Sequence, residues 1–196
     1  MRIPLLLITA IFLTSGAAAA DSVPWKEIKG WGVYMDPTMG NGCYAATAYD
    51  GGTFLRVGFN FLSPQPTIFV ALGNADWKSL EEGKEYPLQI QFDRNPVWDA
   101  QATVFRIDDV NYLGTTTEDA NFLEEFGRKL SMKATFKGRE VAHLRLNGSS
   151  TAVKEILACQ AAVTGLAGAQ KGQQADPKDP FSDAPQSKSA SDPFEL

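Results

Sequence analysis

The sequence predicts a mainly β protein of the α+β class, in which an antiparallel β-sandwich or open barrel is closed by a C-terminal helix. Three observations predict this fold. Apolar and polar residues alternate over short segments, as they do in half-buried strands. Turn-forming residues separate these segments at short intervals. Helical periodicity is confined to two late segments, so the chain lacks the strand–helix alternation of parallel α/β proteins.

The first six predicted strands lie between residues 31 and 107. The clearest of them carries Leu55, Val57 and Phe59 on one face. Before it, Gly51 and Gly52 predict a hairpin turn, because glycine adopts positive φ without steric cost. Segments 21–29 and 108–117 are assigned no strand. The predicted strands cover 31–35, 43–49, 55–61, 67–72, 86–92 and 98–107.

Two helices and a hairpin complete the predicted domain. Residues 118–129 read as a helix, with Thr115 and Glu118 at the spacing of a capping box. Residues 131–146 read as two strands joined by a tight polar turn at 137–139. A last helix follows, with Ser149 or Ser150 as its expected N-cap. Its apolar face is formed by Ala152, Ile156, Cys159 and Val163.

The ends of the chain differ in composition from the predicted domain. Residues 1–20 read as a signal peptide, with Arg2, a short apolar core and small residues before Asp21. That core is much shorter than the roughly 20 residues of a membrane-spanning helix, so no transmembrane segment is expected after cleavage. Residues 21–167 are expected to form one domain. Residues 168–196 are rich in Pro, Ser, Asp and Gln and are expected to be disordered. A periplasmic or secreted location follows from this organisation.

The net charge restricts the classes of partner, and the cysteine content predicts a cross-link within the chain. The formal net charge is −5 and no Lys/Arg cluster is present, which argues against binding to nucleic acid. Cys43 and Cys159 are the only two cysteines. An even number in an exported chain predicts a disulfide, with two buried free thiols as the alternative.

No metal site, cofactor site or catalytic constellation is evident in the sequence. His143 is the only histidine, and it is expected to face solvent from a strand. The cysteines lack metal-binding spacing, and neither a phosphate-binding loop nor a dinucleotide fingerprint is present. Adjacent acidic residues occur in polar segments, so a hydrolase that uses loop carboxylates stays open as a hypothesis.

Two sets of aromatic residues are candidates for binding a partner. Trp77 and Trp98 lie near predicted loops or strand ends, where an indole can anchor a partner. The alternative is that they fill the ends of a small β core. Phe181 and Phe194 belong to a repeated Asp-Pro-Phe motif in the tail. Such a repeat is either a bivalent docking peptide or a coincidence of biased composition.

The last part of the domain resembles the end of the invasion-associated locus B family of small exported alphaproteobacterial proteins. The matching pattern is an apolar helix, a strand, the turn at 137–139, Val141, 144–146, Asn147-Gly148-Ser149 and a final Ala/Leu-rich helix. The placement of a tryptophan before two distant cysteines is also similar to periplasmic accessory proteins of type VI secretion. Either resemblance implies a β-rich periplasmic or envelope protein that binds rather than catalyses.

These observations favour a non-enzymatic exported accessory protein that binds an unidentified partner in the cell envelope. The alternative is a small disulfide-closed β-type inhibitor of an envelope hydrolase, which would insert loop 93–98 into the cleft of its target. The two hypotheses differ in the expected partner, because an inhibitor would form a stable complex with an enzyme.

Overall fold

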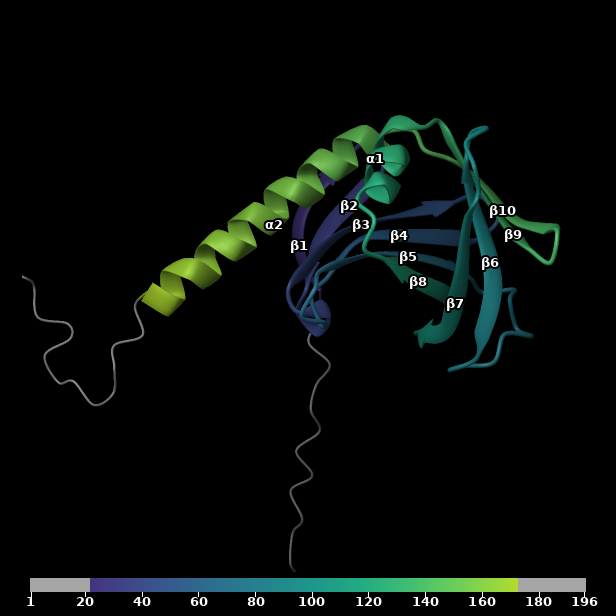
Figure 1. Cartoon of the computed structure of the whole chain (residues 1–196), viewed down its shortest axis with the longest axis horizontal. Helices are drawn as coiled ribbons and strands as arrows, with labels where there is room; N and C mark the ends of the chain where they lie inside the picture. Colours follow the sequence, from purple (N-terminus) through teal and green to yellow (C-terminus); the bar gives the residue numbers. More distant parts are fainter. Residues whose placement is uncertain (1–21, 173–196) are drawn as a thin grey trace, which may run out of the picture.

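The computed structural model describes residues 22–172 of the 196-residue chain. This part forms ten strands, two α-helices and one 3-10 helix (Figure 1). The predicted signal peptide and residues 173–196, with Phe181 and Phe194, lie outside the described residues. The elements are β1 (Val23–Ile28), β2 (Trp31–Asp36), η1 (Pro37–Met39), β3 (Gly42–Tyr49), β4 (Thr53–Asn60), β5 (Thr67–Asn74), β6 (Glu85–Phe92), β7 (Trp98–Ile107), β8 (Val110–Thr117), α1 (Asn121–Arg128), β9 (Ser131–Phe136), β10 (Arg139–Arg145) and α2 (Ser149–Gly172).

All ten strands belong to one sheet, in the order β1-β2-β3-β4-β5-β8-β7-β6-β9-β10. Each neighbouring pair is antiparallel, and the sheet is not closed by pairing between β1 and β10. The sheet curves, so that β6, β7, β9 and β10 stand at an angle to β2–β5 (Figure 1). The predicted α+β class, with an open antiparallel sheet and a C-terminal helix, is confirmed.

Alternation along the strands produces the main core on one face of this sheet. In β4 the buried Leu55 and Val57 face this core, while Arg56 and Gly58 face the other side. The same alternation holds in β9 and β10, as the sequence predicted. The residues that the strands contribute to the core include Val33, Ala45, Val70, Leu72, Leu88, Ile90, Phe92, Val104, Met132, Ala134, Ala142 and Leu144.

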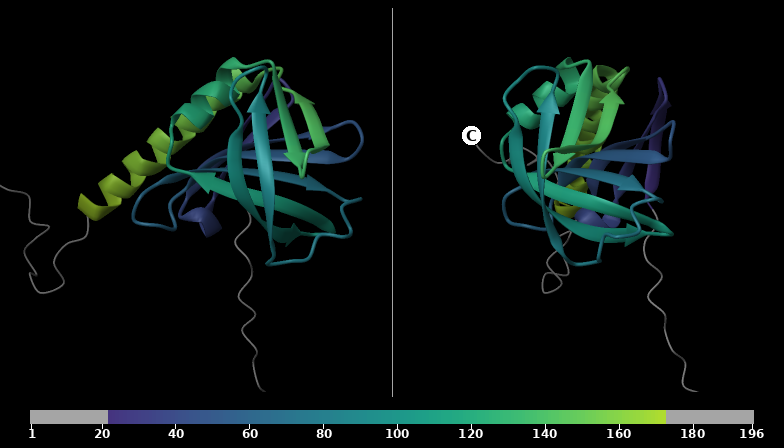
Figure 2. Two further views of the ribbon diagram at one scale, coloured as in Figure 1. Left: turned by 45° about the vertical axis from the view of Figure 1, so that its right-hand side comes forward. Right: turned by 90° about the vertical axis from the view of Figure 1, so that its right-hand side faces the viewer.

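Both helices lie on this core face (Figure 2). From α1, Phe122, Leu123 and Phe126 are buried in it. From α2, the core receives Ala152, Ile156 and Cys159, which are the residues predicted for its apolar face. Val163 packs against them as a half-buried side chain.

A disulfide between Cys43 and Cys159 joins α2 to β3. The two Cα atoms are 6.0 Å apart, and both residues are fully buried. The predicted cross-link is therefore confirmed, and the alternative of two free thiols is excluded. Beside it, the backbone N–H of Cys43 donates to the side-chain oxygen of Gln160 at 2.8 Å. The closing helix is thus held to the N-terminal strands by a covalent and a polar link.

The chain between β10 and α2 returns to the start of β2. The indole N–H of Trp31 donates to the carbonyl oxygen of Asn147 at 2.9 Å, and Tyr49 Oη donates to that of Arg145 at 2.9 Å. Burial raises the pKa of Tyr49 to about 12. Gly148 has φ +85°, and a Cβ there would lie 3.1 Å from that of Lys29. Glycine is favoured at this position, because another residue would be strained at this φ and its Cβ would press against Lys29.

Two segments to which the sequence analysis assigned no strand are strands in the structure. The lead-in contains β1, which is an edge strand with mostly exposed side chains. The polar segment 108–117 contains β8, which pairs with β5 on one side and β7 on the other. Backbone hydrogen bonds to two neighbours stabilise β8 although few of its side chains are apolar, so its composition concealed it.

The predicted helix caps were wrong. Thr115 lies within β8, and α1 begins only at Asn121, whose N–H donates to Asp119 Oδ1 at 2.9 Å. At α2, the backbone carbonyl of Gly148 accepts N–H groups from Thr151 and Ala152, so neither serine is the N-cap. The helix α2 continues to Gly172, five residues past the predicted domain boundary at 167.

Candidate functional site

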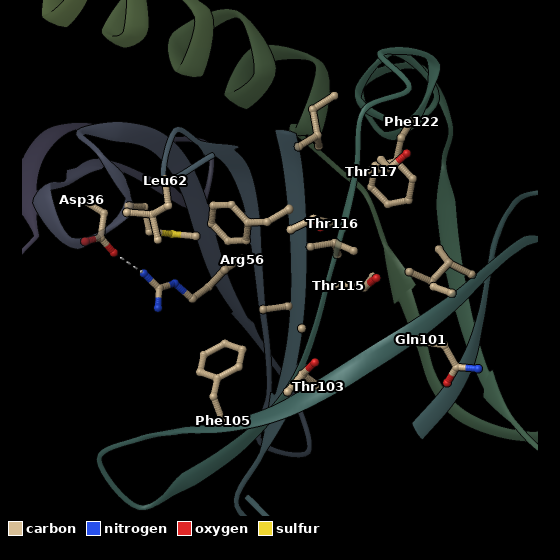
Figure 3. A pocket seen from close by; sticks show the side chains of 18 of the residues that line it. Asp36, Arg56, Leu62, Gln101, Thr103, Phe105, Thr115, Thr116, Thr117 and Phe122 are labelled. Atoms are coloured by element: carbon tan, nitrogen blue, oxygen red, sulfur yellow. Dashed lines mark hydrogen bonds and ion pairs between the residues drawn. The ribbon is translucent and has the colours of Figure 1, made fainter. Parts of the chain in front are cut away.

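The sheet opens between β7 and β8. These strands pair from Ile107 and Val110 up to Thr103 and Gly114, where their pairing ends. Beyond that point, residues 98–102 of β7 pair only with β6, and residues 115–117 of β8 pair only with β5. Each strand therefore has one free edge in this opening, among the residues that the structure describes. Figure 3 shows Thr115, Thr116 and Thr117 on one side of the opening and Gln101 on the other.

Helix α1 packs at the wide end of the opening. The chain leaves β8 at Thr117 and enters α1, whose Phe122 ring packs edge-on against Trp98 at 5.3 Å and against Phe92 at 5.2 Å between ring centroids. The ring thus contacts the start of β7 at the wide end of the opening (Figure 3). Buried aromatic pairs of this kind are favourable, so the apolar face of α1 binds the start of β7 at this end of the opening.

The opening forms a cleft of about 1120 Å³, which we call the β7–β8 cleft. Ligand pockets typically have volumes of about 300–1,000 Å³, so this cleft is large enough for a sizeable ligand. Threonines and Gln101 form its rim, and apolar side chains line it on both sides of the sheet. Its lining residues include Met39, Arg56, Ile68, Phe69, Val70, Ile90, Trp98, Ala100, Gln101, Thr103, Phe105, Thr115, Thr116, Thr117 and Phe122.

An ion pair borders the cleft on the outer face of the sheet, which is the face opposite the main core. Arg56 and Asp36 lie 3.3 Å apart, with side chains only 15% and 9% exposed. The Asp36 carboxylate also accepts the backbone N–H and the hydroxyl of Thr38, at 2.9 and 2.6 Å. The Arg56 guanidinium lies 4.3 Å from the centroid of the Tyr44 ring, in cation–π contact. These contacts hold the arginine in one place, with its guanidinium in the hollow that Figure 3 shows.

Glycines on the outer face of the sheet allow aromatic rings to lie against the backbone. A Cβ on Gly114 would lie 2.6 Å from the ring of Phe105, and a Cβ on Gly73 would collide with the ring of Tyr112. The two rings are themselves stacked, with centroids 5.4 Å apart. Burial raises the pKa of Tyr112, in agreement with its place in this aromatic layer. Phe105 is thereby fixed as a wall of the cleft.

Of the two tryptophans proposed to bind a partner, the structure places one at the cleft. Trp98 is half-buried, lines the cleft, and donates its indole N–H to Glu125 Oε2 at 3.1 Å. Trp77 packs against the main core elsewhere, and its carbonyl oxygen accepts from Asn111 at 3.0 Å. Trp77 and Trp98 therefore do not form one surface. His143 is exposed, as expected for a solvent-facing strand residue.

Loop 93–98 is held firmly at its base. Asp93 has φ +49°, and its carboxylate accepts the N–H groups of Leu130 and Ser131 at 2.9–3.2 Å. Desolvation alone would raise the pKa of Asp93. The hydrogen bonds from Leu130 and Ser131 outweigh it, so the pKa of this carboxyl lies below its ordinary value. Asn95 donates to Glu125 and accepts from Lys129, at 2.8 and 2.9 Å. Around this base, Val97 and Leu130 are exposed, at 45% and 76%.

Sequence reasoning missed most of the cleft. The run Thr115-Thr116-Thr117 was visible, but it lay in a segment that was not recognised as a strand. Arg56 alternates with Leu55 and Val57 and so lies on the opposite face of β4, but its contacts with Asp36 and Tyr44 join residues far apart in sequence. A β-propensity reading of the threonine run would have found β8, although it could not have found the end of its pairing with β7.

The described residues contain neither a metal-binding cluster nor a membrane-spanning helix. Within residues 22–172, no three or more His, Cys, Asp or Glu side chains gather in a way that could hold a metal ion. In the same range, neither helix has the length and apolarity needed to span a bilayer.

Comparison with known proteins gives a likeness in structure but none in sequence family. No protein-family model matches the chain, and no curated protein matches it. The fold is similar to the crystal structure of invasion associated protein b from Bartonella henselae, with a TM-score of 0.51 and 12% sequence identity. The matched region covers 72% of this chain and 99% of that chain. The two proteins therefore share a fold, in agreement with the resemblance seen in the sequence at the level of architecture.

Proposed function

We propose that this chain is a non-enzymatic exported accessory protein that binds a partner in the cell envelope through the β7–β8 cleft. The observation that supports this most directly is the pair of free strand edges in the cleft. Exposed strand edges are sites where another chain pairs with a sheet, and proteins usually cover them unless they are used. The disulfide and the fold shared with an invasion-associated protein are compatible with a location outside the cytoplasm.

Three acidic residues line the β7–β8 cleft, namely Asp36, Asp99 and the exposed Glu85. Two of them already have close partners: Asp36 is bound to Arg56 and Thr38, and Asp99 accepts the side-chain amide of Gln89 at 2.8 Å. A carboxylate held in this way positions neighbouring groups and is poorly placed to activate a water molecule. The ordered rim and apolar walls fit recognition of another molecule.

The experiment is capture of a partner from an envelope fraction with the tagged full-length chain. Thr116→Lys, on the exposed rim of the cleft, should abolish capture. Thr135→Lys is the matched control, since it places the same side chain on a strand outside the cleft. Equal capture by both variants, with unchanged melting temperatures, would show that the partner binds another surface.

Inhibition of an envelope hydrolase is a second candidate function. It is favoured by the hydrogen bonds of Asp93 and Asn95, which hold loop 93–98 in one conformation while Val97 stays exposed. Inhibitors gain affinity from such preorganisation, because little loop entropy is lost on binding. Val97→Asp should then release a captured enzyme without lowering the melting temperature. A captured partner that is retained by Val97→Asp, or has no hydrolase activity, would exclude this candidate.

A further inference from the structure

The hairpin of β9 and β10 carries an excess of positive charge. Residues 131–145 contain four Lys and Arg side chains and one acid, so the hairpin has a formal charge of +3, whereas the whole chain has −5. The four cations are Lys133, Lys137, Arg139 and Arg145. They are spaced along the sequence and form no run, so the sequence alone did not show them as a cluster.

Strand pairing brings these cations together on the outer face of the sheet. Lys133 lies opposite His143 in the register, and the next pair on this face joins Arg145 with Ser131. These positions alternate with residues that are buried in the main core, so their side chains project away from it. Both described helices lie on the core face, so neither of them covers this outer surface (Figure 2).

The hairpin turn extends the charged surface. Lys137 and Arg139 flank Gly138 at this turn, and all three residues are exposed. The turn lies on the far side of the molecule from the C-terminal end of α2 (Figure 1). We call Lys133, Lys137, Arg139 and Arg145 the β9–β10 basic surface. None of these four residues lines the β7–β8 cleft.

Two acids lie close to the β9–β10 basic surface. A register shift after Glu140 places it on the same face as His143, at 3.8 Å from the imidazole. Asp93 accepts the hydroxyl of Ser131 at 3.0 Å, and the exposed Arg94 follows it in the chain and offsets its charge. At physiological salt, charges farther apart than about 8 Å are largely screened from one another, so the acids on other faces weaken this surface little.

The cations of this surface have no fixed acidic partner. Within residues 22–172, none of the four forms an ion pair. Arg56, by contrast, is held by Asp36 and Tyr44. Recognition of one carboxylate in a protein depends on donors held in a defined geometry. The diffuse field of an anionic lipid surface attracts Lys and Arg without such geometry, so the β9–β10 basic surface fits a membrane better than an acidic peptide.

We propose that the β9–β10 basic surface binds the anionic headgroups of a phospholipid membrane and orients the domain with this hairpin against the bilayer. Each Lys or Arg near an anionic lipid surface strengthens binding by about fivefold, so four of them suffice for reversible attachment. The surface is separate from the β7–β8 cleft, which stays free for the partner proposed above.

Flotation of the full-length chain with lipid vesicles tests this proposal. One set of vesicles contains equal parts of phosphatidylglycerol and phosphatidylcholine, and the other contains phosphatidylcholine alone. The apolar segment 5–13 can bind either set, so the quantity measured is the ratio of the two affinities. This ratio should be about tenfold or more in favour of the anionic vesicles. It should fall toward one at about 1 M salt, where the Debye length is about 3 Å.

Matched variants locate the contact on the molecule. Lys133→Gln should lower the ratio by about fivefold. Lys154→Gln removes the same charge from an exposed position on α2 and should leave the ratio unchanged. Thr135→Lys adds a cation on the same face of β9 as Lys133 and should raise the ratio. Equal melting temperatures of the variants exclude a loss of folding as the cause.

The outcomes bear on the β9–β10 basic surface alone. Equal ratios for Lys133→Gln and Lys154→Gln would overturn the proposal, and so would a ratio near one for the unchanged chain. Binding to polyglutamate without preference for the anionic vesicles would overturn it in favour of an acidic protein partner. The test of the β7–β8 cleft remains the loss of capture in Thr116→Lys, so the two proposals succeed or fail separately.

Discussion

Reduction of the disulfide between Cys43 and Cys159 should lower the melting temperature of the chain by roughly 10 °C. The cross-link spans 116 residues, which include all strands from β4 to β10 and the helix α1. In the chain-entropy model, a cross-link over a loop of this length reduces the entropy of the unfolded chain, which raises the free energy of unfolding by about 5 kcal/mol. The stabilisation measured for disulfides is usually smaller, so we expect reduction to lower the free energy of unfolding by about 3 kcal/mol. For a domain of this size, each kcal/mol shifts the melting temperature by about 2–4 °C.

The assay compares the oxidised and reduced chain by circular dichroism melting. Reduced protein keeps both sulfur atoms in the buried site, so the difference isolates the cross-link from any loss of packing. The double variant Cys43→Ala/Cys159→Ala removes both and should melt lower still, because it leaves a cavity. A change of less than 2 °C on complete reduction would refute the estimate, since it would mean that the unfolded chain gains little freedom.

The helix α2 should respond first to this reduction. Cys159 lies in the core, one turn after Ile156, whereas Leu157 on the opposite side is exposed. Without the cross-link, Gln160 is the remaining polar tie to β3, through its bond to the N–H of Cys43. Hydrogen exchange should therefore rise in α2 beyond Ile156 before it rises in the strands. Uniform exchange throughout the domain would contradict this order.

Three further predictions concern single positions and the tail. Gly58→Ala should destabilise by about 2 kcal/mol, because its Cβ would collide with backbone atoms of β3, whereas Gly165→Ala has open space and should be neutral or stabilising in chemical denaturation. Asp93→Asn should lower the melting temperature at pH 7. Because folding lowers the pKa of Asp93, its contribution is present above about pH 4 and is lost as the pH falls through the folded pKa. The melting temperatures of the unchanged chain and of Asp93→Asn should therefore converge in acid. An equal difference between them at pH 7 and pH 2 would contradict a stabilising role of the Asp93 carboxylate. Removing 173–196 should leave the melting temperature unchanged, as expected from the composition of the tail, and a drop of several degrees would show that it packs on the domain.

Alternation of side chains predicted most of the architecture. Leu55 and Val57 in β4 were assigned to one face of their strand, which is buried in the structure, because period-two patterns are local. The helical spacing of Ala152, Ile156 and Cys159 predicted in the same way which side of α2 faces the sheet. With two cysteines in the chain, the pairing of Cys43 with Cys159 had a single intramolecular solution.

Strands stabilised mainly by backbone pairing were harder to predict. Strand β8 has only two buried apolar residues, Tyr112 and Leu113, and β1 has none. Their strand conformation depends on hydrogen bonds to neighbours whose identity the local sequence does not contain.

By itself, the sequence determined the class of the fold, the buried faces of its strongest strands and last helix, and the cross-link between them. Only the tertiary structure decided where the sheet opens. The cleft exists because β7 pairs with β8 only from Thr103 to Ile107, so the edge of residues 98–102 that faces β8 has no partner within residues 22–172, while Phe122 packs against Trp98 beside it. Arg56 reaches its place through Asp36 and Tyr44, on two other strands. Periodicity describes one segment at a time, whereas a free edge is a relation between strands, so it appears only when the whole sheet is assembled.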